Sequence, residues 1–344
     1  MNIFITGESG TIPMALQRLA TNFNCKVLNT QLEDNFLTEL KKHQSFKVRK
    51  PELDFLDRDL FLNNQQLWDQ TDLIVHSGAF VGTDFCNSDP TLAIRTNVEG
   101  TQNIVDVCNL YDIPLIYLST TAILDPEDYG DSKPMSEITE INPQTLYGIT
   151  KYAGELIVQN TCKTEKLILR PVFGFGNYPD DLHSALTKII YVIYRNLKVE
   201  ETELTVLLDK NIPKSYTRVE NIATCILQFA PKVLTSDCTD RTINIGEDYR
   251  KALNWYSLRE IISYQFAIKN ICSQREAQKY FDDCISFSPD QDYLHYHNID
   301  NEFLKSFGQD FDSQENYISI SQGISYTLDS VIDNFDKEPY WLGK

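Results

Sequence analysis

Residues 2–13 read NIFITGESGTIP, and this stretch decides how the chain begins to fold. The apolar run from Asn2 to Thr6 predicts a β-strand, and Met14 to Ala20 predict part of the helix that follows it. Gly7 and Gly10 permit a tight turn between the two elements, in which backbone N–H groups can approach a pyrophosphate at the helix N-terminus. The spacing is GxxGxxP, and proline fits a first helical turn because its missing N–H is not needed there. Taken alone, the motif also fits a plain strand-to-helix turn.

The first half of the chain alternates short apolar runs with helical patterns, which is typical of βα units around a parallel sheet. Further strands are predicted at Lys26–Leu28, Asp72–His76, Pro114–Ser119, Lys166–Pro171 and Thr242–Gly246, and helices at residues 33–42, 90–110, 146–159 and 182–196. We therefore expect an α/β fold with a doubly wound parallel sheet in residues 1–175, completed by about 216–246. A smaller domain is expected from residues 176–344, mainly 176–215 and 247–344.

The composition limits the class of protein. With 344 residues, 42% of them hydrophobic and 23% charged, the chain is typical of a globular protein of about two domains. A net charge of −18 repels phosphate backbones and anionic lipids, which disfavours nucleic-acid and membrane partners. No cysteine spacing suits a metal, and His295 and His297 are interpreted as a surface pair, so no metal site is predicted. Because no signal sequence or apolar run of roughly 20 residues occurs, we expect a cytoplasmic protein.

A tyrosine and a lysine four residues apart carry the candidate chemistry. Tyr147 and Lys151 share one face of the predicted helix, and a nearby ammonium lowers the pKa of a phenol. Tyr147 is therefore a candidate general acid/base, and Lys151 is its tuner and a ribose anchor. The YxxxK pattern is common, but Thr120 follows a parallel strand at the sheet edge where α/β proteins bind ligands. Its hydroxyl could orient a substrate oxygen while Tyr147 moves the proton.

Taken together and in order, these motifs resemble the extended short-chain dehydrogenase/reductase superfamily, in particular its NAD(P)-dependent sugar epimerase/dehydratase branch. The matching motifs are TGxxGxxG at Thr6–Pro13, LD…D at Leu53–Asp57, HxAA at His76–Ala79, DP…TNVxGT at Asp89–Thr101, LRPxxVYG at Leu169–Gly174, RDFVHVDDxA at Lys214–Ala223, NIG at Asn244–Gly246 and the closing pattern at Leu304–Thr327. The resemblance implies a Rossmann domain that binds NAD(P), a C-terminal substrate domain, hydride transfer at a carbon of a nucleotide-linked sugar, and a homodimer.

The resemblance also implies roles for individual residues. The catalytic set would be Thr120, Tyr147 and Lys151. The cofactor would contact Gly7, Ser9, Gly10, Thr11, Ile12, Asn29, Asp54, Phe55, Ser77, Gly78, Ala79, Asn97, Tyr147, Lys151, Pro171 and Val172, and the substrate would contact Thr121, His183, Lys214 and Arg218. Asn29 can hydrogen-bond a ribose 2′-hydroxyl, and no cation near it is suited to a 2′-phosphate, so NAD is favoured over NADP.

The residues around Thr120 narrow the reaction without fixing it. Thr121 and Ala122 replace the Asp-Glu pair of 4,6-dehydratases and the cysteine of 3,5-epimerase/reductases, which disfavours both reactions. Two reactions remain: 4-epimerisation, which the chain length and C-terminal pattern favour, and net reduction, because residues 118–143 resemble dTDP-4-dehydrorhamnose reductases. We expect an epimerase, with a keto-sugar reductase or a non-catalytic NAD(P)-binding sensor or scaffold as alternatives. Lysine at 214 and the absence of arginine in Ser288–Asp292 leave open whether the sugar carries a nucleotide.

Overall fold

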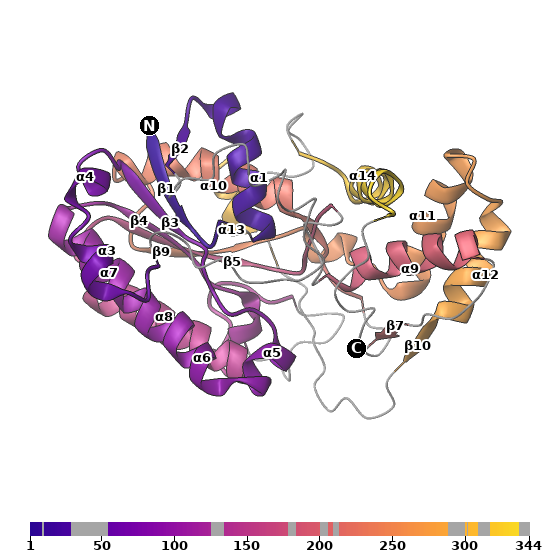
Figure 1. The fold of residues 1–344 in the computed structure, drawn as a ribbon, viewed down its shortest axis with the longest axis horizontal. Coiled ribbons are helices and arrows are strands. Elements are labelled where there is room, and N and C mark those ends of the chain that lie inside the picture. The colour runs from indigo at the N-terminus through magenta and orange to yellow at the C-terminus, as the bar shows by residue number, and fades with distance from the viewer. Residues whose placement is uncertain are drawn as a thin grey trace.

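The computed structural model describes residues 1–8, 10–28, 54–124, 134–177, 184–199, 206–208, 213–287, 300, 302–308 and 317–336. Its centre is a six-stranded parallel sheet with the order β2-β1-β3-β4-β5-β9 (Figure 1). The strands are β1 (Asn2–Thr6), β2 (Lys26–Leu28), β3 (Leu73–His76), β4 (Leu115–Leu118), β5 (Lys166–Pro171) and β9 (Arg241–Ile245). The predicted doubly wound α/β fold is confirmed, and the late strand pairs with β5 at the edge of the described sheet.

Two layers of helices cover the sheet (Figure 1). One face carries α1 (Thr11–Leu19) and α10 (Val219–Leu234), and the other carries α3 (Arg58–Leu62), α4 (Gln65–Trp68), α7 (Gly100–Tyr111) and α8 (Leu146–Thr161). Successive side chains of a strand point to opposite faces. Accordingly, Ile3 and Ile5 pack with α1 and α10, whereas Phe4 packs into the core beneath α7 and α8.

The direction of winding reverses beside β1. After β1 the chain adds β2 on one side, and β3 then pairs with β1 on the other side. The carboxyl ends of β1 and β3 therefore lie next to each other at a topological switch point, where open α/β sheets bind their ligands. Thr6 and His76, the last residues of the two strands, are register partners.

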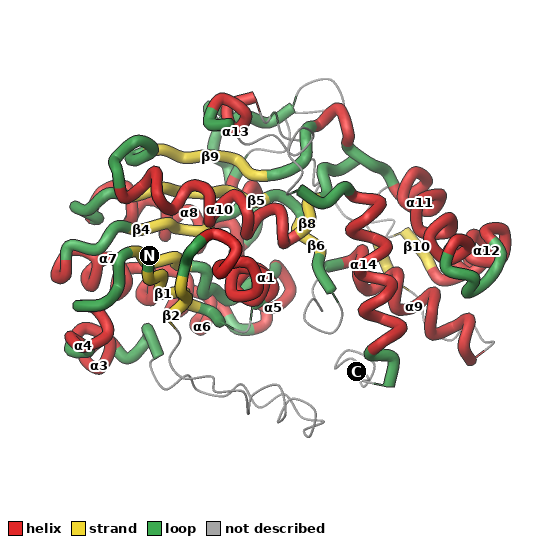
Figure 2. The backbone as a smooth tube through the Cα atoms, turned by 90° about the horizontal axis from the view of Figure 1, so that it is seen from above, coloured by secondary structure: helices red, strands yellow, loops and turns green. Residues whose placement is uncertain are grey.

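A second helical body has its own core (Figure 2). It consists of α9 (Ala185–Val199), α11 (Trp255–Ile268), α12 (Gln274–Cys284), α14 (Ile320–Asp333) and the short pair β7 (Val206–Leu208) and β10 (Ile285–Phe287). Between the two bodies lies a second short pair, β6 (Gly174–Phe175) and β8 (Thr217–Arg218). Part of the C-terminal region belongs to the sheet domain. Leu304 of α13 (Glu302–Ser306) and Tyr317 pack into the core of that domain.

The helix predicted over residues 90–110 is interrupted. It is divided into α6 (Pro90–Ile94), a π-helical turn η2 (Arg95–Glu99) and α7. Asp89 caps the start by accepting the N–H of Leu92 at 2.9 Å. Single π-turns inside helices are frequent at functional sites, and this one lies beside α8. The helix predicted at residues 33–42 lies outside the described residues, and among the described helices none is long and apolar enough to cross a membrane.

Candidate active site

Two glycines allow the ends of β1 and β3 to touch. Gly7 has a φ of +72°, which favours glycine, and a Cβ on it would lie 2.6 Å from the Cα of Gly78. Gly10 is the N-cap of α1, which carries no side-chain cap, and Thr11 and Ile12 form its first turn. The predicted glycine turn and helix N-terminus are thus brought together with Gly78, directly over the switch point.

A buried histidine fixes the loop after β3. The Thr6 hydroxyl accepts the N–H groups of Ser77 and Gly78 at 3.1 and 2.8 Å, and lies 2.7 Å from Nδ1 of His76. Nε2 of His76 lies 3.1 Å from the Thr101 hydroxyl. That hydroxyl donates its own proton to the backbone carbonyl of Asn97 in η2. This network assigns a neutral ring protonated at Nε2, and burial lowers the pKa of His76 well below its usual range.

Phe55 lies beneath the same loop. Its ring meets the His76 ring edge-on at 5.6 Å, and a Cβ on Gly78 would lie 2.9 Å from it. Asp54 accepts the N–H of Leu56 at 2.9 Å, which holds this segment in a turn. The predicted cofactor residues Asp54, Phe55 and Gly78 therefore come together at one edge of the sheet, and the half-buried Ala79 continues the loop.

The N-terminus of α8 is pressed against the end of β4. Thr145 caps the helix by accepting the N–H of Gly148 at 3.0 Å, and a Cβ on Gly148 would lie 2.6 Å from the Ala122 carbonyl oxygen. Ala122 belongs to the 3-10 turn η3 (Thr121–Ile123), which Thr120 caps. This close approach brings the phenol of Tyr147 within reach of the Thr120 side chain. Two residues from separate segments of the predicted catalytic set thus meet.

Lys151 lies one turn further along α8 and is 2% exposed. Its Nζ lies 4.3 Å from the centroid of the Tyr117 ring on β4, a cation–π arrangement. The Tyr117 hydroxyl donates to the Lys151 carbonyl at 3.3 Å, and a Cβ on Gly154 would overlap this hydroxyl oxygen. Gly154 therefore lets α8 lie close enough to the sheet for Lys151 to reach the site.

Burial changes the pKa values of the pair. It raises the pKa of Tyr147 to about 12, with a smaller contribution from the Cys86 thiol, while the hydrogen bond with Thr120 opposes the shift. It also lowers the pKa of Lys151 to about 7, against the opposing charge of Glu155. We predicted that Lys151 lowers the pKa of Tyr147, and this prediction is wrong. Desolvation of the phenol raises its pKa and outweighs any effect of the neighbouring ammonium.

Asn97 is held by the loop that follows β3. Its amide oxygen accepts the Phe80 N–H at 2.7 Å, and its amide nitrogen donates to the Phe80 carbonyl at 3.1 Å and the Thr150 hydroxyl at 2.9 Å. The side chain thus joins the π-turn, the loop and α8. Its expected contact with the cofactor stays a prediction.

The end of β5 lies beside η3. Val172 donates its N–H to the Ile245 carbonyl at 2.9 Å and packs with Ile123 in a small buried cluster. Pro171 ends the strand and is half-buried, and Thr121 is buried within η3. The end of β5 therefore lies beside the turn that follows Thr120, and the expected ligand contacts of Pro171, Val172 and Thr121 stay predictions.

The two predicted substrate cations lie in different surroundings. Lys214 is buried, its backbone pairs with Leu253, and its Nζ lies 4.8 Å from the centroid of the Phe173 ring, next to Val172. Arg218 is 2% exposed, and its guanidinium binds partners inside the protein. These are Glu220 at 2.6 Å, Thr327 at 2.8 Å, Asn177 at 2.5 Å and the Gly323 carbonyl at 3.4 Å. The expectation that Arg218 binds the substrate is corrected, because these bonds use the fork that a phosphate would need.

Three predicted site residues lie outside the described residues, namely Ser9, Asn29 and His183. The same holds for the histidine pair at 295 and 297 and for Ser288–Asp292. Their predicted roles stay predictions.

Comparison with known proteins identifies the family. The family model described as the RmlD substrate binding domain matches residues 1–279. The chain belongs to this family. A dTDP-4-dehydrorhamnose reductase of Aggregatibacter actinomycetemcomitans is 22% identical over 278 residues, 80% of each chain. A putative UDP-glucose 4-epimerase of Methanocaldococcus jannaschii is 23% identical over 274 residues, 78% of this chain and 83% of that protein.

A solved structure supports the same fold. RMD from Pseudomonas aeruginosa, complexed with NADPH, superimposes with a TM-score of 0.69 at 15% identity and covers 96% of this chain and 98% of its own. The expected membership in the extended short-chain dehydrogenase/reductase superfamily is thereby confirmed for this RmlD-family chain.

Sequence reasoning missed several residues that shape this RmlD-family site. Gly148 and Gly154 set the distance between α8 and the sheet, and Glu155 forms a buried ion pair with Arg170 of β5 at 2.7 Å. Glu155 follows Lys151 by four residues, so the same i, i+4 spacing that linked Tyr147 to Lys151 could have found it.

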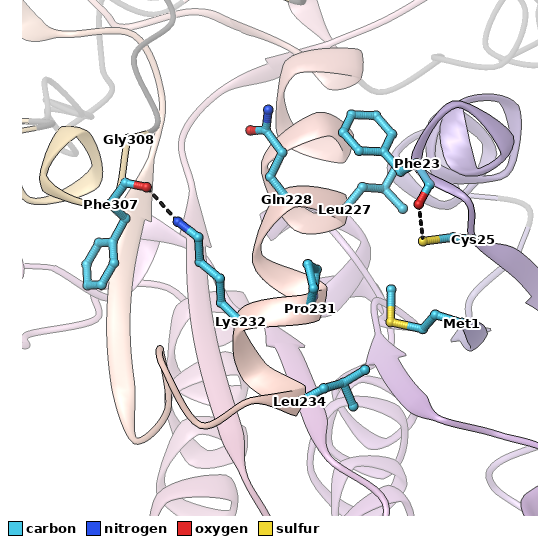
Figure 3. A pocket seen from close by; sticks show the side chains of 10 residues that line it. All are labelled: Met1, Phe23, Cys25, Leu227, Gln228, Pro231, Lys232, Leu234, Phe307 and Gly308. Carbon is cyan, nitrogen blue, oxygen red and sulfur yellow. Dashed lines mark hydrogen bonds between the residues drawn. The ribbon is translucent and has the colours of Figure 1, made fainter.

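Two other features of this RmlD-family chain lie away from the site. A mostly apolar pocket of about 560 Å³ lies between the amino end of β1, η1 (Ala20–Phe23) and α10, and contains none of the predicted site residues (Figure 3). Among the described residues, Asp248, Asp300 and Glu302 bring their carboxylates together. Arg250 and Lys305 bridge Asp248 and Glu302, so we interpret the group as an ion-pair network.

The packing of Gly154 gives a first prediction. We expect Gly154→Ala to lower the free energy of unfolding by about 1–3 kcal/mol, because the added methyl overlaps the Tyr117 hydroxyl. In the Gly154→Ala background, Tyr117→Phe removes the overlapping atom and should restore part of the loss. Urea denaturation of the parent, both single variants and the double variant measures this coupling. Strictly additive losses would contradict the close packing of α8 on β4.

Proposed function

We propose that this chain is an NAD(P)-dependent oxidoreductase that reduces a keto group of a nucleotide-activated sugar. The observation that carries the proposal is that Tyr147 lies against Thr120, with Lys151 one turn further along α8 over the Tyr117 ring, while Gly7 meets Gly78 at the ends of β1 and β3. A hydroxyl, a phenol and an amine at the carboxyl ends of parallel strands suit proton transfer to a carbonyl. The name of the family and of the relative from A. actinomycetemcomitans supports the substrate class.

The residues around the switch point fit a dinucleotide. The uncapped N-terminus of α1, approached through Gly7 and Gly10, suits a pyrophosphate, because side chains there would block the backbone donors. Asp54 and Phe55 would flank the adenine end, with Ser77–Ala79 lining the loop between. Lys151 would hold the nicotinamide ribose, and Pro171 and Val172 would flank the ring. A bound nicotinamide cofactor supplies the hydride.

The protonation state of Tyr147 favours reduction. With its pKa raised to about 12, the phenol keeps its proton at neutral pH and can act as an acid. In the reduction, hydride forms the new C–H bond, the carbonyl π electrons move to oxygen, and that oxygen takes the Tyr147 proton. Thr120, whose side chain lies beside the phenol, would orient the reacting oxygen. An ammonium at Lys151 would stabilise the phenolate that remains.

Epimerisation is the second candidate, because the M. jannaschii relative carries that name over a similar share of the chain. An epimerase begins with oxidation, so Tyr147 would first have to act as a base. The same residues would then return the proton to the sugar, which would take the hydride back from the reduced cofactor.

Measurement of cofactor oxidation and of deuterium retention separates reduction from epimerisation. We expect dTDP-4-keto-6-deoxy-sugars to be reduced with one NADH or NADPH oxidised per sugar, followed by absorbance at 340 nm. Nucleotide sugars that isomerise without net cofactor oxidation, with deuterium retained when a C4-deuterated sugar is supplied, would support epimerisation instead. Tight NADH binding without turnover on a panel of uridine, thymidine and guanosine diphosphate sugars would favour the sensor hypothesis and contradict an enzymatic role.

A further inference from the structure

Glu155 and Arg170 form a buried ion pair one helical turn after Lys151, and the following inference from it rests on the proposed function. We propose that Glu155, held as an anion by Arg170, is a positioning residue that keeps Lys151 in its ammonium form at the active site. The proposed roles of Lys151, holding a ribose and stabilising a phenolate, both require this charge.

The geometry places the carboxylate directly behind the lysine. Glu155 follows Lys151 by one turn of α8, so both side chains lie on the face that packs on the sheet. Glu155 is completely buried, and Arg170 of β5 is 3% exposed. The pair is bidentate, with Nε of Arg170 2.8 Å from Oε1 and Nη2 2.7 Å from Oε2. The two parallel bonds fix the carboxylate as an anion.

Stability does not account for this pair. Moving two charges out of water carries a desolvation cost, and well-packed apolar residues of similar volume are often as stabilising as a buried ion pair. A buried lysine faces the same cost and tends to lose its proton unless an opposite charge lies nearby. The Tyr117 ring offers Lys151 only a cation–π contact, which is weaker than a counter-charge.

Of the negative charges around this ion pair, Glu155 is the one that acts on Lys151. The titratable and charged side chains that face this part of the site are His76 from β3, Tyr117 from β4, Arg170 from β5, Cys86 from α5 (Thr83–Ser88), Tyr147 and Glu155 from α8, and Glu137, which faces Arg170. His76 is neutral, burial raises the pKa values of both phenols and the thiol, and Arg170 is positive. On the neighbouring η2, Arg95 and Glu99 are exposed. Glu155 is therefore the counter-charge, and the pKa of Lys151 remains at about 7 against burial.

A stability experiment tests the inference on the protein alone. The folded-state pKa of Lys151 lies below its unfolded value of about 10.4, so the folded protein binds fewer protons between these values. Parent protein therefore gains stability relative to Lys151→Met as pH rises above about 7. The Glu155→Gln/Arg170→Met background removes both charges of the pair, and it also takes the charge of Arg170 away from the neighbouring Glu137 carboxylate. In this background, we expect the stability gained with Lys151, relative to Lys151→Met, to begin at least about one pH unit lower than in the parent. Urea denaturation from pH 5 to 9.5 measures all four proteins.

Cofactor binding gives the second readout. We expect the affinity for NADH or NADPH, measured by fluorescence titration, to fall as pH rises through the Lys151 midpoint, and this midpoint to move down by the same amount in the double variant. Asp106→Asn is the matched control, because it breaks the solvent-accessible pair of 2.8 Å between Arg58 of α3 and Asp106 of α7, and it should leave the midpoint unchanged.

The outcomes separate the two proposals. Equal midpoints in parent and double variant, in a protein that binds cofactor and turns over, would overturn the role of Glu155 and leave the proposed function standing. A lowered midpoint in the stability curves, without binding of either dinucleotide, would support the electrostatic role of Glu155 and contradict the proposed function.

Discussion

Tyr147→Phe is expected to lower turnover by a factor of about 10²–10⁴ while the affinity for NADH or NADPH stays within about twofold of the parent value. The phenol is the proposed proton donor, and its removal leaves the glycine contact, the α1 N-terminus and Lys151 in place. Stopped-flow absorbance at 340 nm gives the rate, and fluorescence titration gives the dissociation constant. Loss of both together would indicate a damaged site rather than a missing acid.

Tyr152→Phe is the matched control for this variant. Tyr152 lies on the same helix, is partly buried and packs beside the cluster of Ile123 and Val172. Because it has no proposed role in proton transfer, its loss of a hydroxyl should leave turnover within about twofold. If Tyr147→Phe kept the parent rate on an accepted substrate, the acid role of Tyr147 would be wrong.

The sequence predicts the parts of this site that depend on local spacing. The turn at Gly7 and Gly10 follows from the GxxGxxP pattern, and the common face of Tyr147 and Lys151 follows from helical geometry. The parallel sheet follows from the alternation of strands and helices. Each of these needs only residues near one another in the chain.

Contacts between distant segments could not be predicted in this way. The approach of Gly7 to Gly78 depends on the pairing of β1 with β3, and that of Gly154 to Tyr117 depends on how α8 lies on β4. The predicted direction of the Tyr147 pKa shift was wrong because spacing shows the ammonium but not the desolvation of the partly buried phenol. The motif placed Arg218 correctly in sequence, but it could not show that the side chain turns inward.

Arg218→Met tests that inward orientation, and we expect it to lower the free energy of unfolding by about 3–5 kcal/mol. The guanidinium joins the start of α10 to α14 through Thr327 and the Gly323 carbonyl, and it pairs with Glu220. Its loss leaves these buried acceptors without their donor. If Arg218 instead held a substrate phosphate, KM would rise and stability would change little.

Arg18→Met provides the comparison, because Arg18 reaches the same carboxylate from outside. Its Nη2 lies 3.2 Å from Oε1 of Glu220, but its side chain is 42% exposed. Solvent screens such a pair, so we expect a loss of no more than about 1 kcal/mol. Because both variants remove one positive charge beside Glu220, a difference of several kcal/mol in urea denaturation isolates the buried bonds of Arg218. Equal losses of unfolding free energy would show that those bonds contribute little to stability. Arg218 would then again be a candidate for binding the substrate.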